Sequence, residues 1–306
     1  LIGAFITRSG IITSVHAFAT DPERGVFLLW ITAIFMGGAL TLFAARAEAL
    51  SSRGVFSLVS RESMLVLNNI LLAVAAFVVF VGTIWPLISE LAFDRKLSVG
   101  EPFFNMAFTP FFVGLGLALP VGAMMAWKRA KLGRVMRQLM PAMILAVAVL
   151  ALVFALQTGR SALGPIGLML GTWLVAGAAT DLWARTGRSG AGRLLRLPRN
   201  DYGRVTAHAG LGVTIAGIAA MLAWQSEDIR VMQEGDSLTL AGYDITLDSV
   251  ERIQGPNYIS TPGHVTLSRN GREIGQLNPE KRFYPVARMP TTEAGIDNGI
   301  MRDVYV

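Results

Sequence analysis

The sequence predicts a polytopic α-helical membrane protein of about six transmembrane helices, with a small β-rich domain outside the membrane at its C-terminal end. Apolar residues make up 53% of the 306-residue chain, and charged residues make up only 16%. Six segments are apolar over the roughly 20 residues that a helix needs to cross a bilayer. Of the 21 acidic residues, 12 follow residue 225, where polar and apolar residues begin to alternate.

The six predicted spans are separated by polar segments. The first span has a recognisable start, because Asp21 can cap a helix and Pro22 suits its first turn. A loop around residues 86–103, bordered by Gly82–Leu87, should follow the second span. The predicted spans are residues 26–45, 64–83, 104–127, 139–158, 163–183 and 205–224.

The distribution of Lys and Arg predicts the orientation of these spans. The loops after the first, third and fifth spans carry 14 of these residues, and the loops on the opposite side carry 5. Cytoplasmic loops are enriched in Lys and Arg, so the first set should be cytoplasmic. The opposite set would then face the periplasm of a Gram-negative bacterium. These loops explain the net charge of +6, which therefore does not indicate a nucleic-acid partner.

The predicted domains are a periplasmic segment over residues 1–25, a transmembrane domain over 26–224 and a periplasmic β-rich domain over 225–306. Alternation predicts strands in the last domain near residues 237–240, 243–247 and 264–268. Asn270 and Gly271 form the kind of dipeptide that favours a tight hairpin. The chain has no cysteine, which excludes disulfides and thiol chemistry.

His208 is the strongest candidate for chemistry, because ionisable side chains inside membrane helices are costly and often functional. It is predicted to lie four residues into the sixth span. Gly212, Ala216, Ala219 and Ala223 share its helix face. An imidazole above a strip of small residues suits a heme iron and its flat porphyrin. The alternative is that the strip packs against another helix, with a hydrogen-bonded histidine at its border.

The other two histidines are weaker candidates for a metal or heme ligand. His16 precedes the first span, where it could ligate a metal or heme at the membrane surface or be an ordinary interfacial residue. Arg8 can pair with an anionic group such as a heme propionate. His264 follows Pro262 and Gly263 and is predicted to be a surface histidine in a turn. No nucleotide-binding glycine loop, zinc-ligand spacing or nucleophile elbow is present, which disfavours an ordinary ATPase or hydrolase.

Short motifs along the whole chain resemble, in their order and spacing, the cytochrome c maturation protein F (CcmF) family, the large membrane subunit of a bacterial heme lyase. Two of them contain His16 and His208. The motifs are Thr7–Gly10, Ser14–Phe18, Ser60–Ser63, Asn68–Asn69, Gly82–Thr83, Pro86–Leu87, Ser98–Gly100, Pro102–Asn105, Ala207–Gly210, Gly255–Tyr258, Pro279–Arg282 and Thr292–Ala294.

The resemblance implies a cytochrome c heme lyase of the bacterial inner membrane. Such a lyase receives heme from a periplasmic CcmE-like chaperone and promotes its thioether attachment to the Cys-x-x-Cys-His motif of apocytochrome c. His16 would be one axial ligand of that periplasmic heme, with Arg8 near a propionate. His208 would be one axial ligand of a permanent heme b within the membrane, which supplies electrons. A CcmH-like apocytochrome-handling subunit, membrane lipid and quinol are the other implied partners.

The resemblance also implies that the chain is a piece of a longer protein. The Trp-rich heme-binding segment and the first partner of each histidine pair would precede Leu1, and a final helix would follow Val306. We therefore expect the chain alone to bind heme weakly or not at all.

Two other classes of function stay open on the residues alone. A membrane b-heme or quinol electron-transfer protein without lyase activity would use His208 but would give His16 no role. A secondary transporter could use the adjacent amides Asn68 and Asn69 to line a path, although no inverted repeat is visible. A related subfamily that serves cytochrome c nitrite reductase is not separated from the general lyase by these residues.

Overall fold

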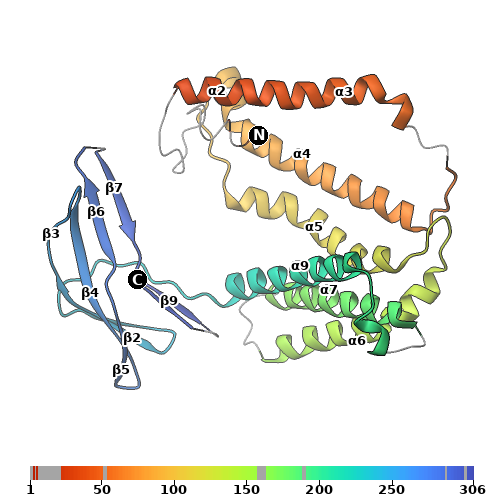
Figure 1. Ribbon diagram of the computed structural model, residues 1–306. Coiled ribbons are helices and arrows are strands. Elements are labelled where there is room, and N and C mark those ends of the chain that lie inside the picture. Colours follow the sequence, from red (N-terminus) through yellow and green to blue (C-terminus); the bar gives the residue numbers. More distant parts are fainter. Residues whose placement is uncertain are drawn as a thin grey trace. The chain divides into compact units, whose positions relative to one another are not determined.

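The structure, a computed structural model of the chain, describes residues 3, 5, 22–50, 54–156, 163–187, 191–286, 288–299 and 302–306. The chain divides into two compact units, Leu1–Ala223 and Trp224–Val306. The first unit is helical and the second is built from strands (Figure 1).

The first unit contains six helices within the described residues that are long and apolar enough to cross a membrane, which confirms the predicted number. In the first of these spans, two α-helical segments are joined by a short π-helix. The elements are α2 (Pro22–Thr32), the π-helix η1 (Ala33–Gly37), α3 (Gly38–Arg46), η2 (Glu48–Leu50), α4 (Arg61–Phe93), α5 (Glu101–Met124), α6 (Leu132–Leu156), α7 (Leu163–Thr186), α8 (Ala191–Leu194) and α9 (Arg199–Trp224).

Helix α4 is ten residues longer at its C-terminal end than predicted. Gly82–Leu87 lies inside this helix, so its prediction as the border of an outer loop is wrong. Pro86 does not end the helix, which continues until Asp94 adopts a left-handed conformation with φ 50°. At about 1.5 Å per residue the helix is roughly 50 Å long, whereas the hydrocarbon core is about 30 Å thick. Helix α4 is therefore longer than the membrane span requires, and the loop begins only after Phe93.

Helices α5, α6 and α9 begin three, seven and six residues earlier than predicted. Arg134, Arg137 and Arg204 consequently lie in the first turns of helices and not in loops. Arginine is a good helix former, and its long side chain can reach the membrane surface from inside a helix. Pro102 at the start of α5 also fits a first helical turn.

The core of the helical unit lies where α5, α6 and α7 meet. Leu139 of α6 and Leu174 of α7 are fully buried there. The indole Nε1 of Trp173 donates a hydrogen bond of 3.2 Å to the carbonyl oxygen of Leu117 on α5. Close packing of these three helices fixes the position of α7, on which α9 in turn packs.

The second unit consists of antiparallel strands. One sheet has the strand order β1-β2-β4-β6-β7, with β3 and β5 also pairing with β4, and β8 pairs with β9 in a separate hairpin. The strands are β1 (Ser237–Leu240), β2 (Tyr243–Val250), β3 (Ile253–Gln254), β4 (Ile259–Arg269), β5 (Arg272–Leu277), β6 (Glu280–Tyr284), β7 (Met289–Glu293), β8 (Ile296–Asn298) and β9 (Asp303–Tyr305).

The predicted hairpin between β4 and β5 is confirmed. Asn270 and Gly271 have φ values of 52° and 73°, which is the left-handed pair that a tight two-residue turn requires. The core of this unit is the buried cluster of Ile245, Val265, Leu267 and Leu277, whose side chains come from β2, β4 and β5.

His264 lies within β4, so its prediction as a turn residue is wrong. Pro262 and Gly263, which resemble a turn signal, pair with β6 and β2 as part of the sheet. The imidazole Nδ1 is 2.9 Å from the amide oxygen Oδ1 of Asn278. His264 therefore has a structural partner on the sheet surface.

Candidate functional site

Of the three predicted heme-contacting residues, the structure describes only His208. His16 and Arg8 lie outside the described residues, so their roles stay predictions. Within the described part of the chain, no group of three or more His, Asp and Glu side chains could hold a metal ion. The candidate site is therefore built around His208 on α9.

His208 lies nine residues after the start of α9, because the helix begins six residues earlier than predicted. At about 1.5 Å per residue this is more than two helical turns, or roughly 13 Å, from the end of the helix. The side chain is half-buried. Its imidazole forms no hydrogen bond or ion pair with any other residue that the structure describes. Among the described residues, the ring nitrogens of His208 thus have no hydrogen-bond partner.

The small residues that follow His208 face α7. A Cβ added at Gly212 would lie 2.7 Å from the carbonyl oxygen of Gly171, and one added at Gly171 would lie 2.9 Å from the Cβ of Ala216. Ala219 contacts Gly167 one turn farther on. Helix α7 therefore fills the strip, and the expectation that the strip leaves room for a porphyrin is wrong. The alternative of a helix-packing face is confirmed for Gly212, Ala216 and Ala219, whereas the hydrogen bond it expected for His208 is not present among the described residues.

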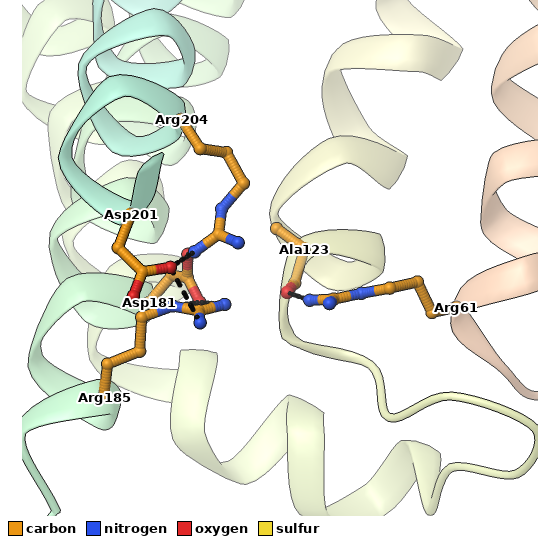
Figure 2. Close-up of polar contacts among 6 residues, drawn as sticks. All are labelled: Arg61, Ala123, Asp181, Arg185, Asp201 and Arg204. Atoms are coloured by element: carbon orange, nitrogen blue, oxygen red, sulfur yellow. Dashed lines mark hydrogen bonds and ion pairs between the residues drawn. The ribbon is translucent and has the colours of Figure 1, made fainter. Parts of the chain in front are cut away.

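A closed ring of ion pairs joins the C-terminal end of α7 to the N-terminal end of α9 (Figure 2). Arg185 lies 3.2 Å from Asp181 and 3.1 Å from Asp201. Arg204 lies 2.9 Å from Asp181 and 3.3 Å from Asp201. Each arginine thus contacts both carboxylates. The side chain of Asp181 is only 5% exposed, so the ring is anchored in the protein interior.

The ring and the small-residue contact lie on either side of His208. Arg204 precedes His208 by four residues and bonds to Asp181, whereas Gly212 follows it by four residues and packs on Gly171. Residues four apart lie on the same face of a helix. The turn of α9 that carries His208 is therefore held against α7 from both sides.

Arg61, at the start of α4, faces this ring across the end of α5 (Figure 2). Its guanidinium donates a hydrogen bond to the carbonyl oxygen of Ala123, one of the last carbonyls of α5, and lies 5.3 Å from the ring centre of Trp127. The carboxylate of Glu62 accepts hydrogen bonds of 2.8 and 2.9 Å from the backbone N–H of Lys128. These contacts tie the basic segment after α5 to the beginning of α4.

The ion-pair ring was not predicted from the sequence. Arg185 and Arg204 were assigned to a cytoplasmic loop, where arginines need no partner. The available signal was Asp181, an acidic residue inside the predicted span 163–183 with an arginine four residues later. A carboxylate within a span indicates a partner, because burying it unpaired is costly.

Comparisons with known proteins agree along the whole chain. Residues 223–306 match the family model described as CcmF C-terminal beta-sandwich. The cytochrome c-type biogenesis protein ccl1 of Rhodobacter capsulatus is 59% identical over 308 residues, which cover 100% of this chain and 47% of that protein. The cytochrome c-type biogenesis protein CycK of Bradyrhizobium diazoefficiens is 46% identical over 302 residues, which cover 97% of this chain and 46% of that protein.

A solved structure named Cytochrome c Heme Lyase CcmF has a similar fold. Its TM-score is 0.67 at 23% identity, and the match covers 93% of this chain and 44% of that one. The chain thus spans about half the length of the relatives it matches. Its six apolar helices, its β-sandwich and its matches over the full length show that it belongs to the CcmF/Ccl1/CycK family of cytochrome c-type biogenesis proteins.

Proposed function

We propose that the protein acts in a cytochrome c heme lyase and supplies one axial ligand of an intramembrane heme b. The observation that carries the proposal is His208, a half-buried imidazole at membrane depth with no hydrogen-bond partner among the described residues. The names of the matched relatives support a role in cytochrome c biogenesis, and the solved relative is named as a heme lyase.

The residues around His208 fit one side of a heme site. A neutral imidazole is a common axial ligand of heme iron. Since α7 occupies the strip of small residues, the porphyrin would lie against the part of the half-buried imidazole that α7 leaves uncovered. The second axial ligand would come from the part of the protein outside this chain. The ion-pair ring and the Gly171–Gly212 contact would keep the imidazole of His208 at a constant depth and orientation.

In this proposal the intramembrane heme provides a one-electron redox centre. His16 would ligate a second heme on the periplasmic side, with Arg8 paired to a propionate. A CcmE-like chaperone would deliver that heme, and a CcmH-like subunit would present the Cys-x-x-Cys-His motif of apocytochrome c. The protein would lie in the bacterial inner membrane with the β unit in the periplasm, and quinol would supply the electrons.

Replacing His208 tests the heme b ligand. We expect His208→Ala in the full-length protein to remove the absorption spectrum of a six-coordinate intramembrane heme, because the imidazole would be one of the two axial ligands of its iron. His264→Ala is the matched control and should leave that spectrum unchanged, since His264 already bonds Asn278. An unchanged heme spectrum in the His208→Ala protein would contradict the assignment.

Replacing His16 separates lyase activity from simple electron transfer. The second candidate function, a membrane b-heme electron carrier, shares His208 but does not need a periplasmic ligand. We expect His16→Ala to abolish holocytochrome c formation in cells while the purified protein keeps its intramembrane heme spectrum. Normal cytochrome c output from this variant would favour the electron carrier.

A further inference from the structure

Part of the β unit extends beyond its hydrophobic core. The buried cluster is formed by side chains of β2, β5 and the second half of β4. Strand β6 pairs with the first half of β4 and β7 pairs with β6, but neither strand contributes a residue to this cluster. Among the described residues, no buried apolar side chain of β6 or β7 covers either face of the sheet in this region.

One face of this extension satisfies its own charges. Arg282 on β6 bonds Glu280, lies 3.6 Å from Glu293 and places its guanidinium 4.8 Å from the ring centre of Tyr258. The hydrogen bond from Arg282 lowers the pKa of Glu280 below its usual value, which is the expected effect of a cationic donor. Tyr284 lies 5.5 Å from Tyr258 on the same face. The charges of this face are therefore paired within it, although the buried Nε of Arg282 has no hydrogen-bond partner among the described residues.

The opposite face has a different composition, because neighbouring residues of a strand point to opposite sides. Ile259 lies opposite Phe283, and Thr261 lies opposite Lys281, in the register between β4 and β6. Together with their neighbours they surround a shallow hollow of about 320 Å³. The hollow is lined by Arg252, Ile259, Thr261, Lys281, Arg282, Phe283 and Pro290.

Two cations at this hollow lack partners. Neither Arg252 nor Lys281 forms a hydrogen bond or ion pair with another residue in the described part of the chain. These cations do not lack partners because acidic residues are scarce, since residues 224–306 contain 12 acidic and 8 basic residues. Phe283, which also lines the hollow, is 44% exposed. The hollow therefore presents positive charge and uncovered apolar surface together on an otherwise acidic unit.

We propose that this hollow is a docking site for an acidic segment of another polypeptide, with a carboxylate placed between Arg252 and Lys281 and an apolar side chain on Phe283. Charge complementarity determines the sign of the partner, and the concave apolar floor favours an inserted side chain over a flat surface. Strand β7, whose Pro290 lines the hollow, is the last strand of the described sheet. The proposal does not depend on the role of His208.

A zero-length cross-link can test contact at this site, because Lys281 is the only lysine of residues 224–306. In native membranes that contain the full-length protein, a carbodiimide should couple the Lys281 amine to an Asp or Glu of a second polypeptide. Mass spectrometry then identifies the linked residues. Lys281→Arg keeps the charge but removes the amine, so it should abolish the cross-link. Absence of any acidic peptide linked to Lys281 would overturn the proposal. That result would instead favour contact of this region with the bilayer, for example through Val286, which is 98% exposed.

Binding of the identified segment provides the second measurement. A synthetic peptide of that sequence should bind the purified full-length protein. Lys281→Glu or Arg252→Glu should raise the Kd of the peptide by about tenfold or more, because the new carboxylate repels the acidic peptide that the cation attracted. Lys281→Arg should bind normally. The matched control is Arg272→Glu, an exposed reversal on β5 away from the hollow. Equal weakening by Arg272→Glu would indicate nonspecific charge attraction and would overturn the site.

Discussion

At the residue scale, Asp181 is the charged residue that is buried among the described residues of the helical unit. Its side chain is 5% exposed, yet it contacts two arginines whose side chains are 27% and 29% exposed. A buried carboxylate is tolerated when it is paired, and removing one partner leaves the others uncompensated. Asp181 therefore stabilises the α7–α9 contact mainly by preventing two close guanidiniums from repelling each other.

This reasoning predicts an asymmetry between the two carboxylates of the ring. We expect Asp181→Asn to destabilise the full-length protein by on the order of 2–3 kcal/mol, somewhat less than for a fully buried pair because the arginines reach water. Asp201→Asn is the matched control and should lower the free energy of unfolding by less. The side chain of Asp201 is 13% exposed, and Asp181 still contacts both arginines in this variant. Thermal unfolding in detergent measures both losses, and an equal or larger effect of Asp201→Asn would refute the asymmetry.

At the element scale, the existence of the helices could be predicted but several of their ends could not. A run of about 20 apolar residues is a local property of the sequence, so all six spans were found. Pro86 was interpreted as the start of a loop, although the apolar sequence on both sides keeps it inside α4. Arg134 and Arg204 were assigned to loops by their charge, whereas a helix accommodates them at its end.

The candidate site shows a similar limit. The position of His208 in a span could be predicted, because one ionisable residue stands out in apolar sequence. The function of the strip at Gly212 and Ala216 could not, since the same small residues suit a porphyrin and a neighbouring helix. Only the approach of Gly171 in three dimensions decides between them. The ion-pair ring was missed for the same reason, because it joins residues from two helices.

The β unit gives a comparable lesson. The β4–β5 hairpin could be predicted, since Asn270 and Gly271 encode their own turn and the flanking strands alternate over a buried core. Strand β6 has the sequence Glu-Lys-Arg-Phe-Tyr, which does not alternate between polar and apolar residues. Alternation reflects burial of one face, and neither face of β6 joins the core. The least predictable strand thus belongs to the surface that we propose as a docking site.

At the scale of the whole molecule, the chain consists of two compact units with separate cores. The helical core centres on Leu139 and Leu174, and the β core centres on Leu267, all fully buried. Because each buried cluster of the described residues lies within one unit, damage to one core should leave the other folded. The proposed heme b ligand then depends on the first unit alone.

Leu267→Ala tests this independence. Removing a fully buried leucine side chain costs about 2–5 kcal/mol, a large part of the stability of a domain of this size. Amide hydrogen exchange of β2, β4 and β5 in the full-length protein should accelerate by about 30-fold or more, since each 1.4 kcal/mol corresponds to a factor of ten. Exchange of α6, α7 and α9 and the intramembrane heme spectrum should be unchanged. Val286→Ala, at a position 98% exposed, is the matched control and should alter neither unit. Faster exchange in α7 and α9 of the Leu267→Ala protein would mean that the two units fold cooperatively, and a mutation in the β unit could then disturb His208 indirectly.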